Sequence, residues 1–131
     1  MRTIKFRGKN VLSAEWVYGG ITAMKDGWCS AITTLTEDEF DSQELVYPET
    51  IGQFTGLLDK NGREIYEGDI LEVCEMYAKV VWNEEKASFE YQYLHPMQLT
   101  NTFYEFNMPY LSIIGNIHDN PELIKSKEIN L

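Results

Sequence analysis

The residues of this chain that could do chemistry are two histidines, His95 and His118, and several carboxylates beside turns. His118-Asp119, with His95 or Asp69, has the residue types of a metal site or a general acid–base pair. Two histidines are few for a hydrolytic centre, and the sequence contains no HExxH, HxH or DxD spacing. It also lacks a GxSxG, a P-loop and a GxGxxG motif. We therefore expect no catalytic residue, no metal and no cofactor, so that the protein is not an enzyme.

At two predicted chain reversals in the middle of the sequence, the polar residues have a structural explanation instead of a catalytic one. Asn61-Gly62 lies between two apolar runs and predicts a β-hairpin, because both residues tolerate positive φ. Gly68-Asp69 predicts a second reversal, in which Gly68 takes a φ that other residues resist and Asp69 accepts hydrogen bonds from backbone amides. A catalytic or metal-binding Asp69 is the alternative, but it has no partner at local spacing. We favour the structural role.

A third group of turn residues follows the apolar strand expected at 110–114. Gly115-Asn116 predicts a turn directly after that strand, and His118 falls within the same stretch. Pro121 predicts the first position of one helical turn over 121–124, with Asn120 as its N-cap. These residues therefore shape the backbone rather than form a site.

Aromatic side chains are one set of binding candidates. Between Ala87 and Tyr93 they alternate with polar residues, and several more follow before Pro109. Exposed aromatics on small barrels stack on single-stranded nucleic acid or contact peptides. Packing in the core or at a subunit interface is the alternative, because half of them share a face with Val80 and Trp82. The candidate residues are Tyr91, Tyr93, Phe103 and Tyr104.

An acidic stretch is the second set of binding candidates. Residues 37–49 carry six acids and no base, and Thr36 with Glu39 fits a capping box. The segment 36–45 is therefore either a short helix or an acidic loop. It could present charge to a basic protein or mimic DNA phosphates, and a solvated surface is the alternative. The candidate residues are Glu37, Asp38, Glu39 and Asp41.

The hydrophobic pattern predicts a mainly β protein, a small barrel or roll with one short helix or helical turn. Apolar and polar residues alternate with period two in short segments bounded by turn residues, as in antiparallel strands. The stretch 94–109 is irregular and is expected to form a long loop. The expected strands are 4–7, 15–18 (ended by Gly19-Gly20), 28–35, 46–47, 50–54, 63–66, 70–74, 78–82, 87–93 and 110–114.

Length and charge set the remaining limits. The 131 residues suit one domain, with an N-terminal β portion 1–49, a barrel core 50–124 and a tail 125–131 as its subdivision. The net charge is −10, which opposes nucleic-acid binding because phosphate contacts supply most of that affinity. The sequence shows no signal peptide and no apolar run of membrane-helix length, and its two cysteines lack a CxxC spacing. We expect reduced thiols, no membrane partner and a cytoplasmic location.

Four parts of the chain form a recognisable set of motifs: Ile4-Lys5-Phe6-Arg7-Gly8, Trp16 with Tyr18-Gly19, the segment 50–70, and the segment 113–123. In these residues the chain resembles the YopX family of phage and prophage proteins. The resemblance implies a small SH3-like barrel or roll with extra strands, self-association, and no established activity or catalytic residue that could be transferred to this sequence. His118 departs from the family motif, which more often has an aromatic residue there, and this weakens a catalytic interpretation.

Three hypotheses for function follow. The first is a phage-encoded, non-enzymatic β module that forms homo-oligomers and binds a host protein in the bacterial cytoplasm. The second is an acidic inhibitor that mimics DNA against a host protein. The third is an enzyme with a scattered carboxylate–histidine site around Asp69, Asp119 and His118.

Overall fold

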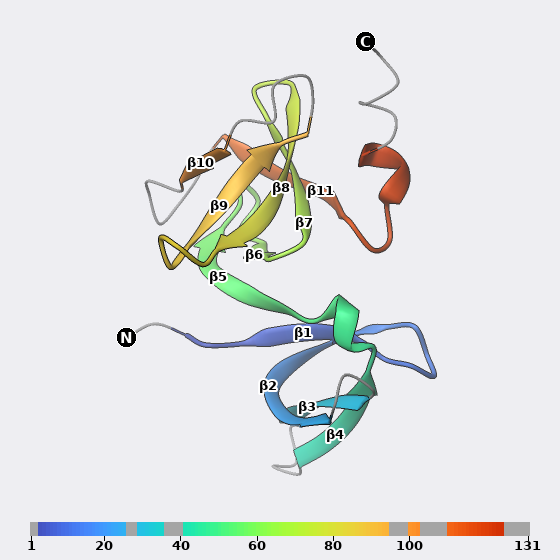
Figure 1. Cartoon of the computed structure of the whole chain (residues 1–131). Coiled ribbons are helices and arrows are strands. Elements are labelled where there is room, and N and C mark those ends of the chain that lie inside the picture. Colours follow the sequence, from blue (N-terminus) through green and yellow to red (C-terminus); the bar gives the residue numbers. More distant parts are fainter. Residues whose placement is uncertain (1–2, 26–28, 36–40, 95–99, 103–109, 125–131) are drawn as a thin grey trace. The chain divides into compact units, whose positions relative to one another are not determined.

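The protein is almost entirely β-structure (Figure 1). The computed structural model describes residues 3–25, 29–35, 41–94, 100–102 and 110–124. The chain divides into two compact units, Met1–Phe54 and Thr55–Leu131, and the division falls within one strand, β5 (Gly52–Leu58). Each unit is described by itself. The mainly β fold of curled sheets expected from the hydrophobic pattern is confirmed.

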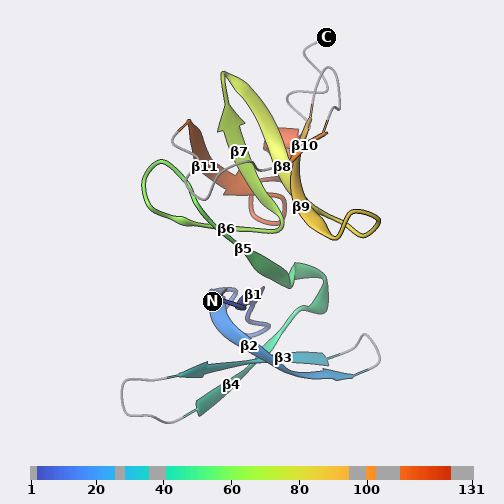
Figure 2. The same ribbon diagram turned by 90° about the vertical axis from the view of Figure 1, so that its left-hand side faces the viewer.

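Unit 1 is an antiparallel sheet in the order β4-β3-β2-β1-β5 (Figure 2). The sheet curls so that the end of β4 returns to the end of β1: Asn10 forms an isolated bridge with Val46, and the Tyr47 N–H donates to the Lys9 carbonyl at 2.9 Å. A 3₁₀ turn then leads into β5. The elements are β1 (Phe6–Lys9), β2 (Trp16–Lys25), β3 (Cys29–Leu35), β4 (Asp41–Val46) and η1 (Pro48–Thr50).

Small residues let the strands of unit 1 approach one another closely. A Cβ atom at Gly8 would lie 2.9 Å from Val46 Cγ2, and one at Gly19 would lie 2.0 Å from the Thr33 carbonyl oxygen. Ile32 and Val46 are fully buried on this side. On β1, Arg7 is 6% exposed and its guanidinium lies 4.7 Å from the centre of a tryptophan ring, that of Trp16, as in a cation–π contact.

Two expectations for unit 1 were wrong. Gly19-Gly20 does not end a strand, since β2 continues to Lys25 with a register shift between Ile21 and Ala23. Gly19 is required by the close approach to Thr33, not by a turn, whereas a Cβ at Gly20 would meet no atom within 4 Å. A helix over 36–45 is also excluded for its second half, where Asp41–Val46 pairs with β3. Residues 36–40 lie outside the described part of the chain.

Unit 2 is an antiparallel sheet in the order β10-β9-β8-β7-β11, with β6 paired to β5. Its core joins buried side chains from β6, β7, β8, β9 and β11, among them Ile65, Leu71, Val80 and Leu111. In β8 the buried Ala78 and Val80 alternate with less buried residues, as expected for a strand with one buried face, whereas four of the five residues of β7 are buried. The elements are β6 (Glu64–Tyr66), β7 (Asp69–Val73), β8 (Met76–Asn83), β9 (Ser88–Tyr93), β10 (Thr100–Thr102) and β11 (Leu111–Asn116).

The stretch expected to be one long loop contains a strand. Thr100–Thr102 forms β10 and pairs with β9, placing Asn101 opposite Tyr91. Three residues are too short for period two to be visible in the sequence. The helical turn expected over 121–124 is present and begins at Pro121.

The reversal at Asn61-Gly62 differs in type from the expected two-residue hairpin. Of these two residues only Gly62 has positive φ, at 79°. The Gly62 N–H donates to the Asp59 carbonyl (3.0 Å), and the Asp59 N–H donates to the Arg63 carbonyl (2.9 Å). This is a type I turn from Asp59 to Gly62 closed by a left-handed glycine, the usual form of a three-residue hairpin loop. Asp59 at the first position of the turn is the residue from which this turn type could have been predicted.

The turn with two left-handed residues occurs instead between β7 and β8. Val73 pairs with Met76, and the two residues between them, Cys74 and Glu75, have φ of 50° and 69°. Positive φ at both central residues is the signature of a type I′ turn, which favours Asn-Gly. This turn type could not be predicted from the sequence, because Cys-Glu is a poor match to that preference.

In the part of the chain that the structure describes, no helix is both long and apolar enough to cross a membrane.

Candidate functional site

The reversal predicted at Gly68-Asp69 and the turn predicted at Gly115-Asn116 lie side by side in unit 2. Asp69, the first residue of β7, is the register partner of Asn116, the last residue of β11. The backbone N–H of Ile117 donates to the carbonyl of Gly68 at 2.9 Å. Segments nearly fifty positions apart in the sequence therefore form one double corner, Gly68-Asp69 against 115–120.

The first half of the double corner is held by the Asp69 carboxylate. This side chain is 2% exposed, and its Oδ2 accepts a hydrogen bond of 2.7 Å from the backbone N–H of Tyr66. Gly68 has φ of 94°, and its N–H donates to the carbonyl of Val80 at 2.9 Å. The Asp69 carboxylate thus closes the reversal between β6 and β7, and it does not face open solvent.

The second half is held by Asn116 and Asn120. Asn116 Oδ1 accepts from the backbone N–H groups of His118 (3.0 Å) and Asp119 (2.9 Å), and its Nδ2 donates to Asp119 Oδ2 (3.1 Å). Asn120 Oδ1 accepts from the Asn116 N–H (3.1 Å), and a Cβ atom at Gly115 would lie 2.5 Å from that oxygen. Amide side chains that bond backbone groups two or three residues on are a turn device.

Gly115 and Asn116 themselves are strand residues, contrary to expectation. They are the last two residues of β11, and the turn comprises 117–119. A register shift between Ile113 and Gly115 lets the strand end at this point. The glycine is needed for the approach of Asn120 rather than for a turn of its own.

The double corner does not bring together a metal site. No group of three or more His, Cys, Asp or Glu side chains within the described ranges is arranged to hold a metal ion. His95 lies outside these ranges. The hydrogen bonds of Asp69, Asn116 and Asp119 described above organise the backbone of the two turns.

A buried carboxylate that sequence inspection missed, Asp59, joins the β5–β6 loop to β11. Asp59 is 1% exposed. Its Oδ1 accepts from the N–H groups of Asn61 and Arg63, both at 2.9 Å, and its Oδ2 accepts from the N–H of Ile113 at 3.0 Å. The neighbouring Lys60 N–H donates to the Leu111 carbonyl at 2.9 Å. The loop therefore covers the outer edge of β11.

These contacts set the charge state of Asp59. Burial would raise the pKa of its carboxyl, but the N–H groups of Ile113, Arg63 and Asn61 and the positive charge of Arg63 outweigh burial and lower that pKa below 3.8. The carboxylate is accordingly ionised at neutral pH and works as an acceptor for three backbone donors.

The aromatic candidates divide between the core and the undescribed part of the chain. Tyr91 is 4% exposed and belongs to the core of unit 2, and the partly buried Tyr93 packs against that core with its ring 5.8 Å from the Tyr91 ring. Tyr91 cannot serve as an exposed stacking platform, so the alternative of core packing holds for it. Phe103 and Tyr104 lie outside the described residues.

The acidic candidates are mostly outside the described residues as well. Glu37, Asp38 and Glu39 belong to the undescribed stretch 36–40, and Asp41 is the first residue of β4, where only its backbone is described.

An acidic groove lies instead on the β8–β9 hairpin. It is lined by residues 81–85, Glu90 and Gln92. Glu90 is 2% exposed, and its carboxylate accepts from Asn83 Nδ2 (2.9 Å) and lies 3.7 Å from Lys86 Nζ. Val81 is the register partner of Glu90 in this hairpin.

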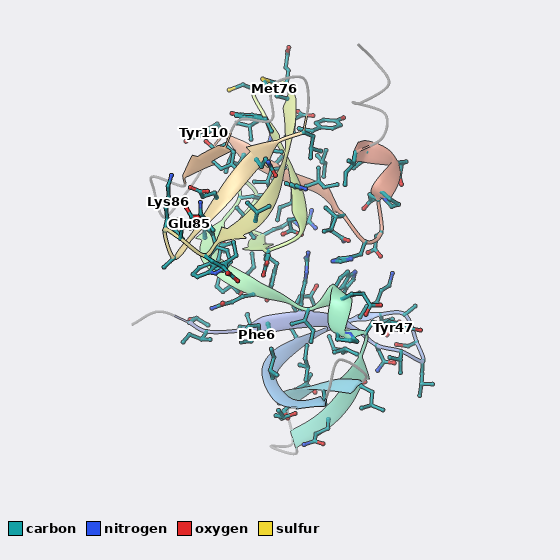
Figure 3. All side chains as sticks on the ribbon, viewed as in Figure 1. Phe6, Tyr47, Met76, Glu85, Lys86 and Tyr110 are labelled. Atoms are coloured by element: carbon teal, nitrogen blue, oxygen red, sulfur yellow. The ribbon has the colours of Figure 1, made fainter. Side chains whose placement is uncertain are left out.

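Unit 1 carries a group of exposed apolar side chains, which we call the apolar patch: Leu12, Leu45 and Tyr47. They are 93%, 49% and 42% exposed. Their segments are joined, because the Val11 N–H donates to the Leu45 carbonyl (3.0 Å) and Tyr47 Oη donates to the Val11 carbonyl (3.3 Å). Figure 3 shows Tyr47 beside the β1–β2 loop. Large apolar side chains gathered at one surface position are typical of a contact site.

The fold and these surfaces define a small all-β protein of two curled antiparallel sheets, whose buried carboxylates organise backbone corners. The chain belongs to the YopX family: the family model, described as YopX protein, matches residues 5–125. The recognition made from the motifs is therefore confirmed.

Among solved structures, the chain is similar to protein EF1440 from Enterococcus faecalis, known from a crystal structure. The two sequences are 25% identical, the alignment covers 95% of this chain and 99% of that chain, and the TM-score is 0.53. No curated protein matches the sequence. The likeness supports the fold over almost the whole length of both chains.

Proposed function

We propose that this protein is a non-enzymatic, self-associating module that binds a host protein in the bacterial cytoplasm and is encoded by a phage or prophage. Membership of the YopX family supports a phage-type protein of unknown function. The non-enzymatic character is supported by the carboxylates of Asp59 and Asp69, which accept hydrogen bonds from backbone N–H groups. A general acid, by contrast, must reach a substrate.

The apolar patch is the observation that carries self-association. Leu12 exposes almost its whole side chain, and Leu45 and Tyr47 extend the same surface. Removing such side chains from water stabilises a contact by about 25 cal/mol for each Å² of apolar area buried. A second copy of the chain presents the same apolar patch, so a two-fold contact would cover both patches at once.

Light scattering tests this proposal directly. We expect the mass of the purified protein to exceed that of one chain, and the triple variant Leu12→Ser, Leu45→Ser, Tyr47→Ser to be a monomer with unchanged circular dichroism. Ile4→Ser is the matched control, because Ile4 is another apolar side chain of unit 1, 60% exposed and not part of the apolar patch. A strictly monomeric wild type, or a triple variant with wild-type mass, would refute self-association through the apolar patch.

The host-protein part of the proposal needs a separate measurement. The immobilised protein is exposed to bacterial lysate, and captured proteins are compared between wild type and the charge-removing pair Glu84→Gln, Glu85→Gln in the acidic groove. We expect one protein to be retained by wild type and reduced with the variant. If the two retain the same proteins in the same amounts, the acidic groove is not the contact.

A further inference from the structure

The Asn61-Gly62 step has a chemistry of its own, independent of partner binding. It is the one Asn-Gly sequence among the 131 residues, and both residues are exposed. Gly62 has no Cβ, and an added Cβ would meet no atom within 4 Å, so the space beside its Cα is open. We propose that Asn61 is a site of spontaneous deamidation and that the loop anchored by Asp59 controls its rate.

The reaction balances without a cofactor. The Gly62 backbone nitrogen gives its proton to water or hydroxide and attacks Asn61 Cγ, forming the new C–N bond. The Cγ–Nδ2 bond then breaks as Nδ2 takes a proton from water, and ammonia leaves. The five-membered succinimide that results takes up one water molecule at either carbonyl. Opening at one carbonyl gives aspartate, and opening at the other gives isoaspartate, in which the main chain runs through the former side chain. No group is oxidised or reduced.

The folded loop restrains this reaction in two ways. The nitrogen that must attack donates its hydrogen to the Asp59 carbonyl at 3.0 Å, and a hydrogen-bonded amide is a poorer nucleophile. The Asn61 backbone N–H is held by Asp59 Oδ1 at 2.9 Å, which limits the rotation that would bring Asn61 Cγ toward Gly62 N. Reaction therefore requires the loop to open locally.

Opening of the loop is itself governed by Asp59. The hydrogen bonds from Asp59 Oδ2 to the Ile113 N–H and from the Lys60 N–H to the Leu111 carbonyl tie the loop to β11. Loss of the Asp59 charge weakens four of the loop's contacts at once, three to backbone N–H groups and one to Arg63. The reactive Asn61-Gly62 sequence and the Asp59 side chain that restrains it therefore lie in the same loop, residues 59–63.

The product would disturb the same loop. A new carboxylate at position 61 lies next to the buried Asp59 carboxylate, and like charges at close range repel. Isoaspartate also adds a main-chain atom between two residues whose N–H groups, those of Asn61 and Arg63, share Asp59 Oδ1. We therefore expect deamidated molecules to unfold at a lower temperature than intact ones.

The test follows the conversion by peptide mapping with mass spectrometry during incubation of the full-length protein in mildly alkaline buffer made with oxygen-18 water. A synthetic peptide of residues 57–66 is incubated in parallel. We expect Asn61 to convert before Asn10, Asn83 and Asn116, with both aspartate and isoaspartate as products. We expect conversion to be roughly tenfold or more slower than in the peptide, which corresponds to an opening free energy of about 1.4 kcal/mol or more. Asp59→Asn should bring the rate in the protein close to that in the peptide.

Two controls make every outcome decisive. Glu72→Gln removes the same charge from an exposed position of β7, away from the loop, and should leave the rate unchanged. Asn61→Gln should abolish conversion at this position. The proposal is overturned if Asn61 stays intact after the peptide has fully converted, if another asparagine reacts first, or if Asp59→Asn and Glu72→Gln behave alike. If Asp59→Asn fails to fold, Arg63→Ala must accelerate the reaction instead, because it removes the positive charge that acts on Asp59 and leaves the backbone N–H donors in place.

Discussion

At the scale of the residue, the most informative side chain is Asp59. It is buried, negatively charged and bonded to three backbone N–H groups from two distant segments. A carboxylate at the first position of a type I turn is common, since it bonds the amides that follow. What is particular to this protein is its second oxygen, which reaches Ile113 on β11 and so links a local turn to a distant strand.

Replacing Asp59 with asparagine should lower the free energy of unfolding by about 2–3 kcal/mol at neutral pH, because the asparagine NH₂ group would face a donor and charge-assisted bonds would be lost. The measurement is urea unfolding, with Glu72→Gln as the control. A cost within the range of ordinary surface substitutions would show that Asp59 is not an anchor.

The pH dependence of that difference has a definite sign. Because the pKa of Asp59 in the folded protein lies below its ordinary value of 3.8, ionised Asp59 stabilises the fold at pH values above 3.8. This contribution is lost as pH falls through the lowered pKa. The gap between wild type and Asp59→Asn should therefore be constant at neutral pH and shrink at acid pH, as measured by urea unfolding at a series of pH values. A gap that grows on acidification would contradict this assignment.

A second prediction at the residue scale concerns the left-handed residues of the β7–β8 turn. Glu75 has φ of 69°, which a residue with a Cβ adopts at a cost of about 1–2 kcal/mol. Glu75→Gly should raise the free energy of unfolding by about 1 kcal/mol, even after the greater freedom of glycine in the unfolded chain is counted. Glu72→Gly, in the extended part of β7, should do the opposite. Thermal unfolding of both variants decides the point.

At the scale of the element, β2 shows why glycine is not always a strand terminator. The strand passes through Gly19-Gly20 because Gly19 lies against the backbone of β3, and not because the chain turns there. A glycine pair has the same appearance in both cases, since close approach and reversal both require the missing Cβ. Only the neighbouring strand distinguishes the two.

The two glycines of β2 therefore predict opposite results. Gly19→Ala would place Cβ 2.0 Å from the Thr33 carbonyl oxygen, so the strands must separate and the free energy of unfolding should fall by about 3 kcal/mol or more. Gly20→Ala meets no atom within 4 Å and should change stability by about 0.5 kcal/mol or less. Similar losses for both variants in thermal unfolding would show that β2 and β3 do not pack in this register.

At the scale of the whole molecule, the net negative charge opposes self-association, whereas the apolar patch favours it. The net charge of −10 repels a second copy, while the apolar patch of Leu12, Leu45 and Tyr47 attracts it. Salt screens charges over about 10 Å at 0.1 M ionic strength but leaves apolar contacts intact. Self-association through the apolar patch should therefore strengthen as sodium chloride is added, measured by light scattering at constant protein concentration. Dissociation by salt would instead indicate a contact made by ion pairs.

The sequence by itself determined the class of fold and the positions of most strands. Period-two alternation located β9, and short apolar runs bounded by turn residues located β7, β8 and β11, because all four strands contribute buried side chains to a single core. Motif matching also identified the family, since the segments 50–70 and 113–123 are distinctive at the level of residue identity. The backbone role expected for Asp69 is one that its hydrogen bond to the Tyr66 N–H supports, because such turns are local.

Only the tertiary structure decided what depends on residues far apart in the chain. The Asp59–Ile113 bond, the burial of Glu90, the close passage of Gly19 beside Thr33 and the meeting of the two corners at Asp69 and Asn116 all join positions with no detectable relation in sequence. The tertiary structure also decided the turn types. Asn61-Gly62 is part of a type I turn, whereas Cys74 and Glu75 are the two consecutive residues with positive φ. The physical reason is that strand register sets where each chain must reverse, and local preference of about 1 kcal/mol gives way to the packing of a whole sheet.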